Sequence, residues 1–89
     1  MANEAADILA PKPNPTATGA SIGLWLSQPG PVRLSLSDLS GKLVYFKQIY
    51  LAEGTHTLDI PESTMSTAGG YLWRVETEQQ QQGGELVKY

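Results

Sequence analysis

The amino-acid sequence predicts an all-β domain, an immunoglobulin- or fibronectin-like β-sandwich of about seven antiparallel strands. Segments that alternate apolar and polar residues recur along the chain, and turn residues separate them. No segment repeats its apolar residues with the roughly 3.6-residue period of an amphipathic helix. Strands of this kind bury one face each, so two sheets packed against each other are expected.

The N-terminal part of the chain is expected to lie outside the domain, with residues 1–12 as a linker or leader and residues 13–89 as the folded unit. Residues 1–7 are acidic and lack the basic and apolar regions of a secretory signal. The prolines at positions 11, 13 and 15 exclude a helix, because proline lacks an amide proton and restricts the residue before it. Residues 7–10 can form a short edge strand ahead of them.

The first two long strands are expected on either side of a proline-rich turn. Residues 20–28 place three aliphatic side chains on one face and Trp25 on the other. Residues 32–37 alternate valine and leucine with arginine and serine, which is the pattern of a half-buried strand. In the turn that follows, Asp38 can accept hydrogen bonds from the amides ahead of it, and Gly41 can adopt a positive φ.

The middle of the chain predicts a second pair of strands. Residues 42–51 are rich in β-branched and aromatic residues, which favours a central strand. Gly54 lies in the next turn. Residues 55–60 then place His56 on the same face as two aliphatic side chains.

The C-terminal third begins with a polar stretch, residues 62–68, that is expected to be a loop although it contains Met65. The next strand places Tyr71 on one face with two other large apolar side chains, and Tyr71 suits a tyrosine corner, in which the hydroxyl bonds back to upstream backbone. Residues 79–84 are polar and glycine-rich and are expected to form a solvated hairpin loop. Residues 85–89 are expected to form a last short strand.

Composition and charge exclude several classes of protein. The formal net charge is -3 and the six basic residues are scattered, whereas nucleic-acid binding depends on clustered Lys and Arg. The chain has no cysteine, so it holds neither a disulfide bond nor a thiolate metal site. Its apolar runs are too short to cross a bilayer.

The residues that carry chemistry show no catalytic or metal-binding pattern. His56 is the only histidine, no serine lies in a nucleophile-elbow pattern, and the histidine is expected to be packed or to lie at a rim. The nine carboxylates lack the spacing of a calcium loop, and each is explained by a turn or an outer strand face. No enzymatic activity, cofactor, metal or small-molecule substrate is therefore expected.

Four aromatic side chains can instead be considered as a platform for a sugar, as in carbohydrate-binding modules of similar fold. They are Trp25, Tyr45, Tyr50 and Trp73. Strand alternation places Trp73 in the core and leaves Trp25 as the better candidate for exposure. Packing in the core is therefore the favoured explanation for Trp73.

Several motifs follow one another in a recognisable order. They are Pro13-Asn-Pro15, Asp38-Leu-Ser-Gly-Lys42, Gly54-Thr-His-Thr-Leu58, Ala68-Gly-Gly-Tyr-Leu-Trp-Arg-Val75 and Leu86-Val-Lys88. This ordered set resembles the C-terminal sorting domain that the type IX (Por) secretion system recognises on secreted and surface proteins of the Bacteroidetes. The resemblance covers residues 13–89 and implies an immunoglobulin-like sandwich at the end of a larger cargo protein.

The resemblance implies a secretion signal rather than an enzyme. By this resemblance the domain is expected to direct its cargo from the periplasm through the outer-membrane translocon to the cell surface or the medium, and a sortase-like protease is expected to remove it afterwards. The motif residues with a structural reason for their place are Pro13, Asn14, Pro15, Asp38, Gly41, Gly54, Gly70 and Tyr71. The residues expected to contact a receptor are Lys42 and Arg74, which point outward, and Glu85, Leu86, Val87, Lys88 and Tyr89 of the last strand. Such a strand can peel away and pair with the edge of a partner's sheet.

Two other functions stay open at this point. One is a fibronectin-like adhesion or carbohydrate-binding module that remains on a surface protein, and the other is a spacer between domains. A sorting domain is expected at the end of its parent protein, whereas a module or a spacer is expected to have further domains after it.

Overall fold

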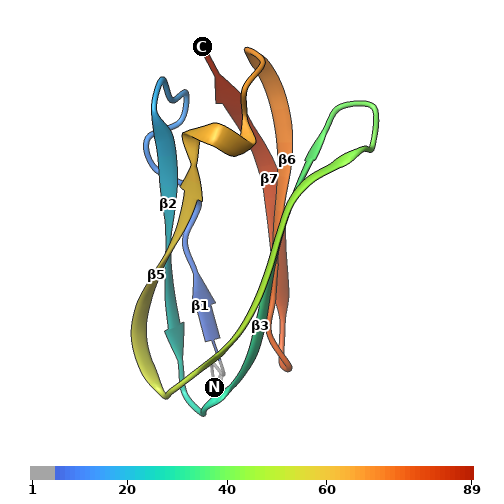
Figure 1. Ribbon diagram of the computed structural model, residues 1–89. Coiled ribbons are helices and arrows are strands. Elements are labelled where there is room, and N and C mark those ends of the chain that lie inside the picture. The colour runs from blue at the N-terminus through green and yellow to red at the C-terminus, as the bar shows by residue number, and fades with distance from the viewer. Residues whose placement is uncertain (1–5) are drawn as a thin grey trace.

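The computed structural model describes residues 6–89, which form two antiparallel β-sheets with the core between them (Figure 1). One sheet has three strands in the order β1-β2-β5, and the other has four in the order β4-β3-β6-β7. The elements are β1 (Ala6–Ile8), β2 (Gly19–Leu26), β3 (Gly30–Asp38), β4 (Leu43–Leu51), β5 (Gly54–Pro61), the 3-10 turn η1 (Glu62–Thr64), β6 (Gly69–Glu76) and β7 (Gln81–Lys88). The prediction of an all-β chain with about seven antiparallel strands in two sheets is confirmed.

The three-stranded sheet is centred on β2, which buries every second side chain. Ile22, Leu24 and Leu26 are buried, whereas Trp25 points outward with 39% of its surface exposed, as predicted. β5 pairs with β2 along its whole length, and its two buried side chains, Leu58 and Ile60, face the same core.

Part of the expected N-terminal linker belongs to the fold. β1 pairs with β2, and Ile8 on β1 is buried in the core. Farther along, the backbone of Lys12 exchanges two hydrogen bonds with that of Ser21 on β2 (2.9 and 2.8 Å). The folded unit therefore includes residues 6–12 as well as residues 13–89. Residues 1–5, the rest of the expected linker, lie outside the described residues.

The four-stranded sheet has β3 and β6 at its centre. Both strands alternate buried and exposed side chains, as their sequence patterns predict. The buried side chains face the three-stranded sheet and are Val32, Leu34, Leu36, Tyr71, Trp73 and Val75. The two strands pair with each other from Arg33–Glu76 to Asp38–Tyr71.

β4 lies at the edge of this sheet, so the prediction of a central strand over residues 42–51 is wrong. Lys47 pairs with Leu34, whose side chain faces the core, yet Lys47 itself is exposed. A charge on the inner face of an edge strand discourages another strand from pairing there. The prediction failed because β-branched and aromatic residues are favoured in strands of both kinds and do not distinguish the edge from the centre.

β7 is longer than the sequence predicts, because residues 81–84 belong to the strand rather than to a loop. The hairpin between β6 and β7 is confined to residues 77–80, and a hydrogen bond of 2.8 Å joins its first amide to its last carbonyl. Gly83 lies in the strand, where a Cβ atom would come within 2.8 Å of the Trp73 carbonyl oxygen. Glycine is present here because the two strands approach closely, which a sequence pattern does not distinguish from a loop.

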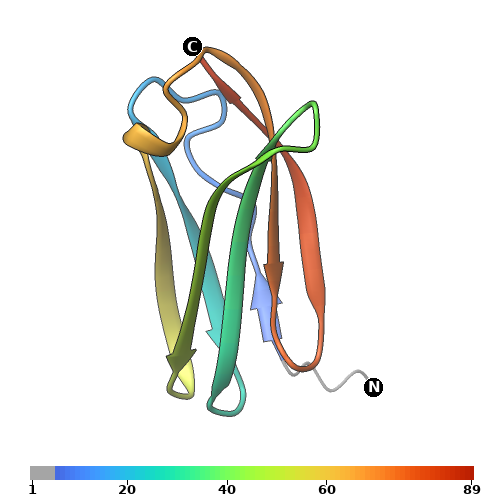
Figure 2. The same ribbon diagram turned by 45° about the vertical axis from the view of Figure 1, so that its right-hand side comes forward.

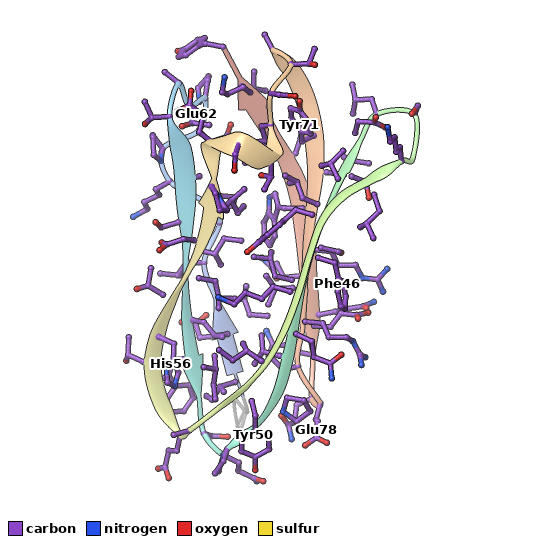
Figure 3. All side chains as sticks on the ribbon, viewed as in Figure 1. Phe46, Tyr50, His56, Glu62, Tyr71 and Glu78 are labelled. Atoms are coloured by element: carbon purple, nitrogen blue, oxygen red, sulfur yellow. The ribbon has the colours of Figure 1, made fainter. Side chains whose placement is uncertain are left out.

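Met65 closes the core at one end, although the sequence places it in a polar loop. Its side chain is completely buried at the point where the chain crosses from β5 through η1 to β6. The residues on either side of it are at least partly exposed, so a single buried residue produces no period that predicts its burial. Side chains from both sheets fill the space between the layers (Figure 3).

Candidate recognition surface

Most of the motif residues gather at one end of the molecule, the end at which the chain terminates (Figures 1 and 2). We call this the terminal end and define it by residues 12–18, 38–42, 62–71 and 85–89. The strands run along the long axis, which measures 40 Å, so the two ends of the molecule are far apart. Gly54 lies at the opposite end, where β5 begins, and its φ of 119° is that of a turn glycine.

Asn14 binds the backbone of β7 from outside the sheet. Its side-chain Nδ2 donates to the Glu85 carbonyl oxygen (2.9 Å), and its Oδ1 accepts from the Val87 amide (3.0 Å). A carboxamide offers one donor and one acceptor in the same way as a peptide group. Asn14 therefore takes the place of a neighbouring strand along this part of the edge.

Thr16 extends the contact to the end of the chain. Its amide donates to the Val87 carbonyl (2.8 Å), and its carbonyl accepts from the Tyr89 amide (2.9 Å). Its buried hydroxyl accepts from the Gly19 amide (3.0 Å) and donates to the Gly19 carbonyl, which holds the turn into β2. We call residues 14–16 the clasp, because they cover the edge of β7 from residue 85 to residue 89.

Thr16 directly follows Pro13-Asn-Pro15 in the opening motif of the series, but no role was predicted for it. The available signal was a threonine three residues before a glycine, because threonine hydroxyls close short turns onto nearby amides. The bond to β7 has no local signal, because it joins residues more than 70 positions apart. The sequence predicts a structural role for Asn14, and the structure shows that this role is to hold the edge of β7.

The last strand is held more firmly than the sequence predicts. Leu86 is completely buried, and the Lys88 side chain is 10% exposed with its ammonium 4.0 Å from the Glu62 carboxylate. Glu85 and Tyr89 are exposed. Of the residues predicted to contact a receptor in this strand, Leu86 faces the core, and the edge that a partner strand would need is occupied by the clasp.

Asp38 builds the hairpin between β3 and β4. Its carboxylate accepts from the amides of Ser40 and Lys42 (3.0 Å each) and from the Ser40 hydroxyl (2.6 Å). These bonds, the one from the Ser40 side chain first, lower the pKa of Asp38 below its ordinary value. Gly41 has a φ of 94° and donates to the Asp38 carbonyl (3.0 Å), so the predicted turn is confirmed. Lys42 is exposed at the end of this hairpin, which projects from the sheet in Figure 1.

A cleft of about 370 Å³ opens between this hairpin and residues 64–71. Asp38, Lys42, Gly70 and Tyr71 all line it, so four motif residues from two distant segments surround one hollow. The Tyr71 hydroxyl donates to the Thr67 carbonyl, which confirms the hydrogen bond predicted for it. The walls of the cleft carry an exposed cation, the Asp38 carboxylate, hydroxyl groups and backbone polar groups.

Arg74 is exposed, as predicted, but it lies on the outer face of the four-stranded sheet and not at the terminal end. Its guanidinium lies 3.0 Å from the Glu76 carboxylate and also bonds to the Gln81 side chain. Arg33 binds the same carboxylate at 3.2 Å. Arg74 therefore belongs to a network of surface charges, separate from the motif residues around the cleft.

The part of the chain that the structure describes contains no group of three or more histidine, aspartate or glutamate side chains that could hold a metal ion. His56 lies near the end opposite the terminal end (Figure 3), and its Nε2 is 2.6 Å from the Ala52 carbonyl oxygen. No helix within residues 6–89 is long and apolar enough to span a bilayer.

The four aromatic residues considered as a sugar platform do not come together. Trp73 is buried in the core, as predicted, and Trp25 is exposed on the three-stranded sheet. Tyr45 and Tyr50 lie on β4 in the other sheet, where Tyr45 packs against the core and Tyr50 is 70% exposed.

Comparison with known proteins supplies no family for this chain. No protein-family model matches it, and no curated protein matches it. A functional proposal for the chain therefore rests on its residues and on their geometry.

Proposed function

We propose that this chain is a C-terminal sorting domain, a folded signal that directs a larger cargo protein through the type IX outer-membrane translocon. The observation that carries the proposal is the gathering of most of the ordered motifs at the terminal end, although Gly54 and Arg74 lie elsewhere. The motif segments 13–15, 38–42, 70–71 and 86–88 are distant in the sequence, yet they all reach this end of the molecule. One receptor can therefore contact the exposed parts of these segments at once.

We infer further that the two sheets form a sandwich of the immunoglobulin or fibronectin type. The strand orders β1-β2-β5 and β4-β3-β6-β7 support this inference, because they combine hairpins with crossings between the two layers, as Greek-key sandwiches do. The hydrogen bond from Tyr71 to backbone four residues upstream also supports it, because tyrosine corners occur in this class of fold.

In this proposal the domain is a substrate and an address and has no catalytic activity or cofactor of its own. Its partners are the cargo, the translocon and a sortase-like protease, and it passes through the periplasm to the cell surface or the medium. The exposed residues at the terminal end, Lys42, Glu85 and Tyr89, are the ones we propose for contact with the receptor. Burial gives Leu86 a role in folding instead.

The test is export of a reporter. Residues 6–89 are fused behind a fluorescent protein that carries a periplasmic signal peptide, and the fusion is expressed in a host with an active type IX system. We expect the reporter at the cell surface or in the medium. We expect the double change Lys42→Gln and Tyr89→Ala to reduce export while the melting temperature changes little, because both side chains are exposed and no like charge is placed beside Asp38.

The matched control is Glu53→Ala, an exposed change in the turn before β5 at the opposite end of the molecule. It should leave export unchanged. A reporter that stays in the periplasm with the unaltered domain overturns the sorting function. If the double variant is exported as well as the control, the sorting function still holds, but Lys42 and Tyr89 do not belong to the receptor site.

A further inference from the structure

The outer face of the four-stranded sheet carries several large apolar side chains. Among residues 6–89, eight large hydrophobic residues are exposed, and Leu43, Phe46, Tyr50 and Leu72 are on this face. Phe46 points away from the interior in Figure 3. Several large apolar side chains exposed on one face of a sheet can mark an interaction surface.

The strand register arranges the outward side chains in rows that cross β4, β3, β6 and β7 in that order. The rows are Leu43–Ser37–Leu72–Glu85, then Phe46–Ser35–Arg74–Gly83, then Gln48–Arg33–Glu76–Gln81. In the second row large side chains alternate with small or absent ones, and the first row does the same up to Leu72 but ends in Glu85. In the third row a cation and an anion are neighbours at the centre.

Reversing the order of each row brings most of its members opposite a complementary residue, and the exception is the outer pair of the first row, where Leu43 lies over Glu85. Reversal places Leu72 over Ser37 and Phe46 over Gly83, so that large side chains meet small residues. We propose that this face binds the same face of a second copy of the chain, about a two-fold axis that runs parallel to the strands between β3 and β6. Such an axis places β4 of one copy over β7 of the other, which is the reversal that the rows require.

A hollow among the residues of these rows also supports the proposal. It measures about 570 Å³, and its lining includes Ser35, Ser37 and Gly83. The hollow cannot be filled from within the chain at Gly83, because a Cβ atom there would collide with the Trp73 carbonyl at 2.8 Å. The Phe46 ring of the second copy, which is 51% exposed in the single chain, is the side chain that the reversal brings to Gly83.

The charged residues favour a two-fold axis parallel to the strands over one perpendicular to them. With the axis parallel to the strands, Arg33 of one copy lies over Glu76 of the other. A two-fold axis perpendicular to the strands would instead place Arg74 over Arg74 in the middle row, and like charges at an interface are costly. The face covers one side of a small sheet, so we expect a weak, reversible dimer. This inference does not depend on the sorting function and stands or falls separately from it.

The test is sedimentation equilibrium of the full chain from about 10 µM to about 1 mM, a range that reaches the weak end of specific association. We expect a reversible monomer–dimer equilibrium. The single changes Leu72→Ser and Ser37→Leu should each weaken dimerisation at least about tenfold, as changes at the centre of an interface do. The first removes the large side chain, and the second makes two leucines collide.

The double change, which exchanges the residues at positions 37 and 72, should restore dimerisation, because a large side chain again faces a small one across the axis. Trp25→Ser is the matched control, because it removes an exposed aromatic residue from the other sheet and should leave dimerisation unchanged. Thermal melts verify that each variant is folded. If Leu72→Ser or Ser37→Leu does not fold, Phe46→Ser is measured in its place. A chain that stays monomeric over the whole range overturns the proposal. Dimerisation that the exchange does not restore overturns the two-fold arrangement.

Discussion

At the scale of single residues, the side chain of Asn14 makes the hydrogen bonds to β7 that a neighbouring strand would otherwise make. It satisfies one carbonyl and one amide on the edge of β7, and the backbone of Thr16 satisfies the next two groups. The prolines on either side of Asn14 exclude a helix, and the chain bends at residues 13–15 beside β7, where the Asn14 side chain reaches the strand. The motif Pro-Asn-Pro therefore has a structural explanation that needs no receptor.

Replacing Asn14 with alanine should loosen the end of β7 without unfolding it. Loss of two hydrogen bonds on an exposed edge should lower the free energy of unfolding by about 1–2 kcal/mol. Hydrogen exchange measured by NMR should show faster exchange of the Val87 amide, while the Leu86 amide, which faces β6, stays protected.

Asn14→Asp is the matched variant, because it keeps an acceptor for the Val87 amide and loses the donor to the Glu85 carbonyl. The Val87 amide in this variant should exchange more slowly than in Asn14→Ala and faster than in the unaltered chain. Unchanged protection of Val87 in Asn14→Ala would show that the side-chain bond does not hold the strand in solution.

At the scale of elements, the two edges of the four-stranded sheet are protected in different ways. β4 turns the charge of Lys47 toward the inner face, whereas β7 is covered from residue 85 onward by the clasp. Both devices prevent uncontrolled pairing with other strands. Below the clasp, β7 continues through residues 81–84, where glycines allow the strand to lie close to β6.

The close approach of β6 at Gly83 predicts whether a substitution there raises or lowers the free energy of unfolding. Alanine is normally better than glycine inside a regular element by about 0.5–1 kcal/mol. Here the added methyl group meets a backbone carbonyl at 2.8 Å, and relief of such a clash costs about 1–3 kcal/mol. Gly83→Ala should therefore lower the free energy of unfolding measured in urea.

Gln82→Ala is the control, because it lies next to Gly83 on the same strand and is exposed. Its effect should stay within about 0.5 kcal/mol. An increase in stability for Gly83→Ala would mean that β6 and β7 can separate enough to accept the methyl group.

At the scale of the whole molecule, the connection from β5 to β6 joins the two layers and closes the core. η1 and the residues after it make this crossing, and Met65 is their one completely buried side chain. The same crossing forms one wall of the cleft that the motif residues surround. The stability of the core and the shape of the terminal end are therefore linked through one residue.

Met65→Ala should lower the free energy of unfolding by about 2–5 kcal/mol, because it leaves a cavity between the sheets. Met65→Leu keeps most of the volume and should cost less than about 1.5 kcal/mol. Chemical denaturation followed by tryptophan fluorescence measures both. Equal stability of the alanine variant and the unaltered chain would show that this end of the core is open in solution.

The sequence by itself determined the features that depend on neighbours along the chain. Alternation in β2, β3 and β6 correctly predicts which side chains are buried, and turn chemistry correctly predicts the Asp38–Gly41 hairpin and the Tyr71 bond. Only the tertiary structure decided that β4 is an edge strand, that Met65 is in the core and that the clasp covers β7. The physical reason is that periodicity and turn geometry arise from interactions within a few residues. Strand order, burial of an isolated residue and bonds across more than 70 positions are set only when distant segments pack together.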